Sequence, residues 1–295
     1  MGGWGMDKFI QLTLTGVTNG AIFALIALGF VLIYKASDVI NFAQGDFLLV
    51  GAYITFALVA QLGLPWSIGV LLTMVLAVLL GLVVERLVLR PLIGEPIISV
   101  IMVTIGLSSV LRALVSSVWG NRGQPFPGFI PDDPITIAGA IVPADRIIAI
   151  VLAGLLLIIF TLFFRYSREG IAMRATADDQ QAAMSMGISV KKVFALAWSI
   201  AAVTAALAGV LVANILGVSG AVASLGLRVF PVVILGGMDS VLGAIVGGLI
   251  IGLLEAYTGG YVGGGLSQVI PFLVLILILM VKPYGLFGEV RIERV

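Results

Sequence analysis

Residues 9–34, FIQLTLTGVTNGAIFALIALGFVLIY, decide the fold class of this chain. The stretch carries no charged residue, and it exceeds the roughly 20 mainly apolar residues that an α-helix needs to cross the hydrocarbon core of a bilayer. Asp7 and Lys8 precede it, and it contains no obvious small-residue cleavage site. We therefore expect a retained first transmembrane helix rather than a cleaved signal peptide.

The rest of the chain has the same apolar character. Of its 295 residues, 61% are hydrophobic and 11% are charged, and its mean hydropathy is +1.22. Soluble domains are about 45–50% apolar and about 25% charged, so a water-soluble enzyme and a disordered protein are both excluded. The chain has no His and no Cys, so thiol nucleophiles, His-centred triads and thiolate or imidazole metal sites are excluded. A net charge of +1 does not indicate a nucleic-acid partner.

Further apolar runs predict the number of membrane crossings. Together with the first, the long runs lie at about 9–34, 39–60, 66–89, 97–118, 147–164, 193–216, 240–258 and 266–282. A ninth stretch, about 225–238, is short and is interrupted by Pro231 and by Gly236-Gly237. The predicted fold is an all-α polytopic membrane protein, a single transmembrane domain over residues 1–295 with eight long helices and a short broken ninth segment.

Lys and Arg residues predict the orientation, because cytoplasmic loops carry an excess of them. With the N-terminus outside and nine crossings, most fall inside: Lys35, Arg86, Arg90, Arg165, Arg168, Arg174, Lys191, Lys192, Lys282, Arg291 and Arg294. A re-entrant ninth segment would move the last three outside, so the pattern favours an odd number of crossings. The long outer loop is then about 119–146, and the long inner loop is about 165–192.

The inner loop predicts a short amphipathic helix. Thr176 stands three residues before Asp179, as in a capping box, and Asp178 and Asp179 favour the positive end of a helix dipole. Gly187 is a plausible helix stop. An apolar stripe follows the start, made of Ala182, Ala183 and Met186. Its residues are small, which favours docking into a protein groove over lying on lipid headgroups, the alternative.

A polar cluster precedes the second apolar helix. Asn41, Gln44 and Asp46 lie near the predicted cytoplasmic start of that helix. A carboxylate in the membrane faces the protein interior or a cavity, because exposure to lipid costs at least about 2–3 kcal/mol. These side chains either line the inner half of a translocation path or its gate, or have a structural role in which Asp46 pairs with Arg112 or Arg228 or caps a broken helix.

Glycines recur at the spacing that lets membrane helices approach closely. Gly16, Gly20 and Ala24 share a face of the first helix, and Gly243-Gly247 and Gly248-Gly252 repeat the pattern. Helix packing is the favoured interpretation.

A functional alternative concerns the region around the broken segment. There, Gly236, Gly237 and Gly243 would surround a discontinuous helix that moves during transport. Glu255 and Tyr257 are either polar pore residues or interfacial anchors.

Three segments in order carry a family resemblance. They are NFAQGD at 41–46 followed by GAY at 51–53, GIAMRATADD at 170–179, and LGGMDS at 235–240. The chain resembles, from about residue 16 to about residue 287, the permeases of branched-chain amino acid ABC transporters, and specifically the first of their two permease subunits. Permeases for urea and other neutral amino acids share these motifs.

The resemblance implies a multi-pass protein of the bacterial inner membrane with four kinds of neighbour: a paralogous second permease, two cytoplasmic ATPases, an extracytoplasmic solute-binding protein and membrane lipid. ATP is then bound by partner subunits, so this chain needs no cofactor. The inner loop corresponds to the family's coupling loop, which sits in a groove of the ATPase. The matching positions here are Gly170, Arg174, Ala175, Asp178 and Gly187, while Asp46 stands where the family often has Glu.

The favoured function is therefore the permease of an ATP-driven importer for branched-chain or other hydrophobic neutral amino acids. The alternatives are a urea or short-amide permease of the same family, and an ion-coupled carrier that uses Asp46 and Glu255. A membrane enzyme is disfavoured, because no spacing of paired carboxylates supports acid–base catalysis.

Overall fold

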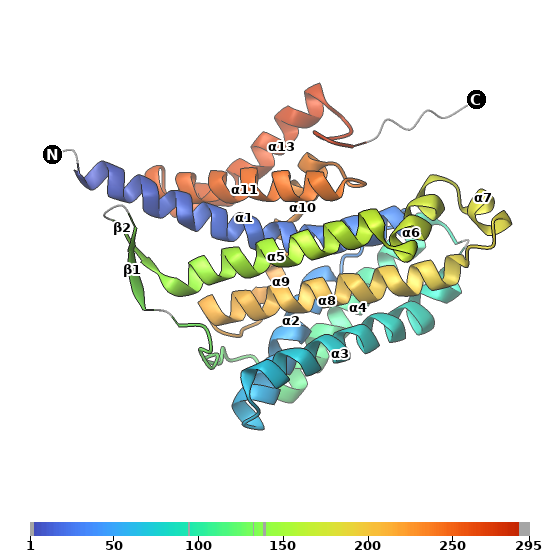
Figure 1. Ribbon diagram of the computed structural model, residues 1–295, viewed down its shortest axis with the longest axis horizontal. Helices are drawn as coiled ribbons and strands as arrows, with labels where there is room; N and C mark the ends of the chain where they lie inside the picture. Colours follow the sequence, from blue (N-terminus) through green and yellow to red (C-terminus); the bar gives the residue numbers. More distant parts are fainter. Residues whose placement is uncertain (1–2, 94, 132, 138–139, 289–295) are drawn as a thin grey trace. The chain divides into compact units, whose positions relative to one another are not determined.

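The computed structural model describes residues 3–93, 95–131, 133–137 and 140–288, and these are almost entirely helical (Figure 1). The helices are α1 Gly3–Ser37, α2 Gln44–Phe56, α3 Trp66–Val84, α4 Ile97–Trp119, α5 Ala144–Tyr166, α6 Arg168–Asp178, α7 Gln180–Ser185, α8 Val190–Leu216, α9 Ala221–Arg228, α10 Phe230–Gly236, α11 Val241–Tyr261, α12 Gly264–Ser267 and α13 Ile270–Val281. Two π-helical turns, η1 Ala57–Gln61 and η2 Glu85–Leu89, and the 3-10 turn η3 Arg90–Leu92 extend α2 and α3.

Eight helical spans among the described residues are long and apolar enough to cross a membrane, which confirms the eight predicted runs. The predicted broken segment is also present, but it covers 221–236 rather than 225–238. It consists of two short helices, α9 and α10, which meet at Val229. Pro231 lies in the first turn of α10, where its missing N–H is not needed, so the chain breaks and restarts there.

The chain divides into two compact units. The first unit contains residues 1–27, 130–157 and 228–295, and the second contains residues 28–129 and 158–227. The long helices α1 and α5 each contribute one part to each unit.

In the first unit, α1 packs antiparallel against α11 through glycine. A Cβ atom on Gly248 would lie 2.6 Å from the carbonyl oxygen of Gly20, and one on Gly252 would lie 2.5 Å from that of Gly16. The two backbones therefore touch without an intervening side chain. This contact confirms the packing interpretation of the glycine spacing.

The antiparallel contact also bears on the number of crossings. Leu12 near the start of α1 meets Gly260 near the end of α11. Between these two helices, the described chain has five other long spans. If each of these five spans crosses once, an α11 antiparallel to α1 requires a sixth crossing, for which the α9–α10 segment is the candidate. This agrees with the odd total that the charge pattern favours, and it places Lys282 inside.

In the second unit, α8 packs against both α2 and α3, and Figure 1 shows α8 in yellow beside α3 in cyan. Small residues again bring backbones together. A Cβ on Gly81 of α3 would lie 2.6 Å from the carbonyl oxygen of Trp198, and Gly209 of α8 directly faces the backbone of Leu48 in α2. The buried Trp198 ring then packs edge-on against Phe47.

The predicted outer loop contains a β-hairpin that the sequence analysis missed. Strands β1 Pro134–Ile137 and β2 Ala140–Pro143 pair antiparallel, with Pro134 opposite Pro143. Proline is tolerated at these positions because they are strand ends on a two-stranded sheet.

The substitution Gly248→Ala tests the α1–α11 contact. The new methyl group would meet backbone, which cannot rotate away, so we expect a loss of about 1–3 kcal/mol in unfolding free energy. Thermal unfolding in detergent measures it. Gly154→Ala is the matched control: Gly154 lies within a helix with open space around its Cβ position, and should be neutral or slightly stabilising. Equal melting temperatures for the two variants would contradict the contact.

Candidate functional site

Two groups of residues are candidates for function. The first is the polar cluster, defined as Asn41, Gln44, Asp46, Ser108 and Arg112. The second is the inner corner, defined as residues 163–187, where α5 ends and α6 and α7 follow. Both lie in the second unit.

As predicted, the polar cluster lies at the start of the second helix, but this start is level with the middle of α8 and of α4 rather than with their ends. The amide Nε2 of Gln44 donates to the carbonyl oxygen of Ala201, midway along α8, at 3.2 Å. Asp46 contacts Ser108 and Arg112, which lie beyond the first two turns of α4. Helix α2 therefore begins inside the membrane. Hydropathy marks how long a span is, but not how deep its helix starts.

Asn41 and Gln44 hold the non-helical segment that leads into α2. Asn41 Oδ1 accepts from the backbone N–H of Ala43 at 3.0 Å, and Asn41 Nδ2 donates to Gln44 Oε1 at 3.1 Å. Both side chains are completely buried. Unpaired backbone groups are not tolerated at membrane depth, so these amides stabilise the break. Neither is exposed on the surface of this chain.

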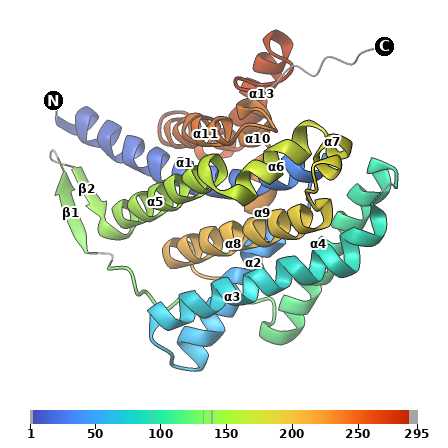
Figure 2. The ribbon, with the colours of Figure 1, turned by 45° about the vertical axis from the view of Figure 1, so that its right-hand side comes forward.

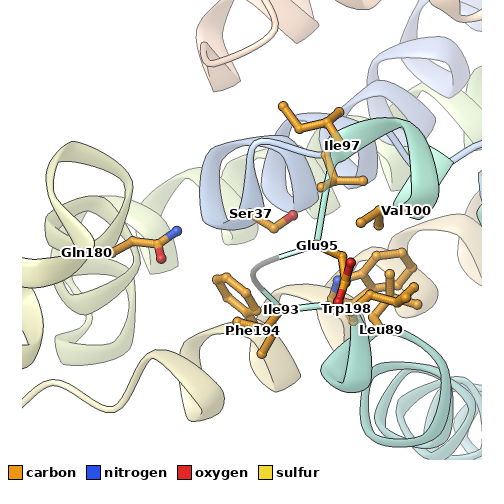
Figure 3. Close-up of a pocket in the computed structure, with 11 residues that line it drawn as sticks. Ser37, Leu89, Ile93, Glu95, Ile97, Val100, Gln180, Phe194 and Trp198 are labelled. Carbon is orange, nitrogen blue, oxygen red and sulfur yellow. The ribbon is translucent and has the colours of Figure 1, made fainter.

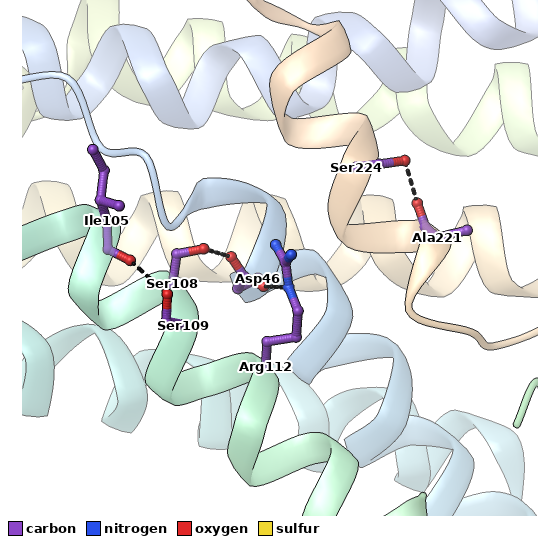
Figure 4. A network of polar contacts seen from close by, with 7 residues as sticks. All are labelled: Asp46, Ile105, Ser108, Ser109, Arg112, Ala221 and Ser224. Atoms are coloured by element: carbon purple, nitrogen blue, oxygen red, sulfur yellow. Dashed lines mark hydrogen bonds and ion pairs between the residues drawn. The ribbon is translucent and has the colours of Figure 1, made fainter. Parts of the chain in front are cut away.

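Asp46 is buried and pairs with Arg112. Its Oδ2 accepts from the Ser108 hydroxyl, and its Oδ1 accepts from Arg112 Nε at 3.2 Å (Figure 4). Of the two cations that the sequence offered as partners, Arg112 is the one that binds, which confirms that structural alternative. The Arg112 side chain is 55% exposed. Sequence reasoning missed Ser108, although its spacing of four residues from Arg112 puts both on one face of a helix.

Arg228 instead lies close enough to Glu255 to act on it electrostatically, and Glu255 is half-buried on α11. Tyr257 stacks on Phe9, and its hydroxyl lies 2.9 Å from Thr13 Oγ1. Tyr257 thus joins the outer ends of α1 and α11, as an interfacial anchor does.

Gly236 and Gly237 form the turn between α10 and α11. Gly237 has φ +106°, which side chains other than glycine rarely adopt. The backbone of Gly236 directly faces Gly243, and its carbonyl oxygen accepts from the N–H of Phe287 at 3.0 Å. The turn is therefore closely packed against the segment that follows α13.

The inner corner is braced by Arg174. Its guanidinium donates from Nη1 to the carbonyl oxygen of Phe164 at 2.8 Å and from Nη2 to that of Arg165 at 3.2 Å. These carbonyls belong to the last turn of α5, where no intrahelical donor remains. A Cβ on Gly170 would lie 2.5 Å from the Phe164 oxygen, and Ser167 caps α6 by accepting from Gly170 N. Helix α6 is thus held directly against the end of α5.

Helix α7 begins later than predicted. Thr176 does not cap it, because α6 already includes Thr176, whose hydroxyl donates to the carbonyl oxygen of Ala172 at 2.8 Å. Asp179 is the N-cap, and its Oδ1 accepts from the N–H of Ala182 at 2.9 Å. The predicted helix of about ten residues is therefore the shorter α7. Gly187, with φ +83°, follows its last turn as predicted.

The inner corner exposes apolar side chains. Met184 and Met186 of α7 and its following turn are 54% and 83% exposed, and Ile171 of α6 is also exposed. The predicted alanine stripe is wrong, because Ala183 faces inward and is buried while Met186 faces outward. The exposed Asp178 lies between Ile171 and Met184 in the sequence. Such a patch is typical of a protein contact surface.

A pocket of about 140 Å³ lies behind α7 (Figure 3). Gln180 forms one wall, and Phe194 and Trp198 of α8 form another. The turn between α3 and α4 contributes Ile93 and Glu95. Figure 2 shows α6 and α7 at the start of α8. Among the described residues, no group of three or more acidic side chains could hold a metal ion.

Comparisons with known proteins identify the family. A family model described as "Branched-chain amino acid transport system / permease component" matches residues 12–279. The chain belongs to this permease family. It is 33% identical to the high-affinity branched-chain amino acid transport system permease protein LivH of Escherichia coli K12, over 97% of this chain and 98% of LivH. It is 31% identical to BraD of Pseudomonas aeruginosa, described as a permease protein of the same kind of system, over 97% of this chain and 98% of BraD.

A solved structure supports the fold. PsaBC from Streptococcus pneumoniae in complex with Fab aligns with a TM-score of 0.50 and 16% identity, over 92% of this permease and 90% of that chain. The protein is therefore a multi-pass inner-membrane permease of an ABC importer and not an enzyme, as the sequence predicts.

A double-mutant cycle tests the Asp46–Arg112 pair. Arg112→Gln leaves the buried carboxylate without its counter-ion. We expect the unfolding free energy to fall by about 1–3 kcal/mol. This is less than the roughly 3–5 kcal/mol lost when a fully buried pair is broken, because Arg112 is half-exposed. Adding Asp46→Asn to Arg112→Gln should recover part of the lost unfolding free energy, because the buried carboxylate is then removed as well. Chemical unfolding followed by tryptophan fluorescence measures both, with Arg122→Gln on the exposed outer loop as control. Strictly additive effects would show that the two residues do not interact.

Proposed function

We propose that this chain is the permease subunit of an ATP-driven importer for branched-chain or other hydrophobic neutral amino acids. It works with a paralogous second permease, two cytoplasmic ATPases and an extracytoplasmic solute-binding protein. The substrates that the names of LivH and BraD state and the small number of charged groups in the described spans both support this substrate class.

The observation that carries the proposal is the brace between Arg174 and the last carbonyls of α5. We assign ATPase docking to the exposed Met184 and Met186 and to Asp178 on the inner corner. Gly170 and Arg174 face the other way and join the corner to α5. Because α6 cannot shift without pulling on α5, a displacement by the ATPase is passed into the membrane.

The remaining predicted coupling positions fit these two roles. Asp179 starts α7 and Gly187 ends it, so they define the docking element. Ala175 is half-buried in α6, between the docking surface and the brace.

For the translocation path, we propose that the polar cluster stands beside it, with Asn41, Gln44 and Asp46 acting from behind the surface. In the first unit, taken by itself, we propose that Gly236 and Gly237 provide a hinge at the α10–α11 turn and that Glu255 is a polar pore residue of α11. The non-helical segment before α2 and the α9–α10 break support these roles, because discontinuous helices at membrane depth surround transporter sites.

The substitution Arg174→Ala tests the brace. It removes two hydrogen bonds to α5 but leaves the exposed docking surface intact. In proteoliposomes with all partner subunits, we expect ATP hydrolysis to continue while leucine uptake falls at least about tenfold, because about 1.4 kcal/mol of lost coupling corresponds to a factor of ten. Arg86→Ala, at an exposed basic residue of the η2 turn, is the control and should transport normally.

Three results would overturn the proposal. Normal uptake by Arg174→Ala would remove the brace from the mechanism. Uptake by this chain without any ATPase, abolished by a protonophore, would favour the ion-coupled carrier. Uptake of urea but not leucine by the full complex would favour the short-amide permease.

A further inference from the structure

Arg112 is a charged residue in an unusual position. It lies in α4 seven residues before the outer end of a 23-residue span, within the depth of the hydrocarbon. A charge there is costly unless it faces protein or water. Yet its side chain is 55% exposed on this chain. In the assembled transporter, contact of this surface with water or protein is therefore favoured over contact with lipid.

The guanidinium of Arg112 has hydrogen-bond donors that this chain does not use. Asp46 accepts from Nε alone. Within the described residues, Nη1 and Nη2 have no hydrogen-bond partner in this chain. In Figure 4, these two nitrogens point past Asp46 and away from α4. An arginine fork of this kind matches the two oxygens of a carboxylate.

The face of α4 around Arg112 carries hydroxyl groups as well as the exposed Ile105. Ser109 and Ser116 lie within about 60° of Arg112 around the axis of α4, at 3.6 residues per turn, and Ser109 is exposed. Helix α9 passes beside the start of α2, where Gly45 meets Ala223, and its Ser224 is also exposed. The α4 hydroxyl groups beside this half-exposed cation suit water and a polar solute.

We propose that Arg112 binds the carboxylate of the transported amino acid as it passes through the membrane. The inference rests on the proposed function and adds a specificity residue to it. Asp46 already supplies a counter-charge, so no acidic residue of a partner is needed for neutrality. Asp46 also weakens the hold of Arg112 on a second carboxylate, and a solute must bind weakly enough to leave. A urea or short-amide substrate has no carboxylate and would have no use for Arg112.

Thiol chemistry tests the proposal, because the chain has no cysteine. Ser109→Cys is placed in the complex with the partner permease and ATPases. Its reaction rates are measured with an anionic sulfonatoethyl and a cationic trimethylammonioethyl methanethiosulfonate. We expect the anionic reagent to react faster, and Arg112→Gln to lower the anion-to-cation rate ratio at least about tenfold. Val110→Cys is the control for a lipid-facing position. Val110 is exposed on α4 but lies about 100° from Ser109 and about 160° from Arg112 around the helix axis, so this variant should react with neither reagent.

Substrate protection then identifies the ligand. L-leucine should slow modification of Ser109→Cys, whereas L-leucinamide, which lacks the carboxylate, should not. Arg112→Lys keeps the charge but not the fork, so it should retain the reagent preference and lose protection by leucine. This variant separates carboxylate binding from a general effect of charge or folding.

Negative results would distinguish a failure of this inference from a failure of the proposed function. An unreactive Ser109→Cys in a complex that still imports leucine would place Arg112 against the partner permease and overturn this inference alone. Equal protection by leucine and leucinamide would also overturn it. A wild-type complex that imports no leucine would instead overturn the proposed function.

Discussion

The hydrocarbon core of the membrane offers no partner for an exposed backbone N–H or C=O group, and the rest of this structure follows from that constraint. Most of the described chain meets it with helices. Where helices break, side chains or neighbouring backbone groups supply the hydrogen bonds that the helix no longer makes. Asn41 and Gln44 pair with the segment before α2. At the membrane face, Arg174 pairs with the last carbonyls of α5.

The same constraint explains why glycine is used in two different ways. Along one side of α11, Gly248 and Gly252 allow the backbone of α1 to approach. Along another side, Gly243 and Gly247 face α10, the second half of the broken segment. One helix thus contacts both a continuous helix and a discontinuous one. The contact with α10 is the place in the first unit where a rearrangement could occur without breaking a long helix.

The sequence predicts the helices well and the orientations of individual side chains poorly. Apolar runs reveal spans because length and hydropathy are all that a crossing requires. They do not reveal depth, so the start of α2 was placed too close to the cytoplasm. The Thr176 cap was wrong because a stronger start at Ser167 lets α6 run through it. Arg174 was expected on the docking surface, but no local pattern indicates that its side chain folds back onto α5. The Asp46–Arg112 pair was foreseen as an alternative, since a buried carboxylate needs a cation and few were available.

The central claim is that an ATPase binds α7 and the turn that follows it on the cytoplasmic side. Met186→Cys provides the most direct measurement, because the chain has no other thiol and Met186 is 83% exposed. A short bifunctional cross-linker applied to native membranes should join Met186→Cys to the ATPase subunit. Leu62→Cys, exposed beyond the outer end of α2, should not be joined to it. Cross-linking of Met186→Cys to an extracytoplasmic protein, or to no ATPase at all, would contradict the account.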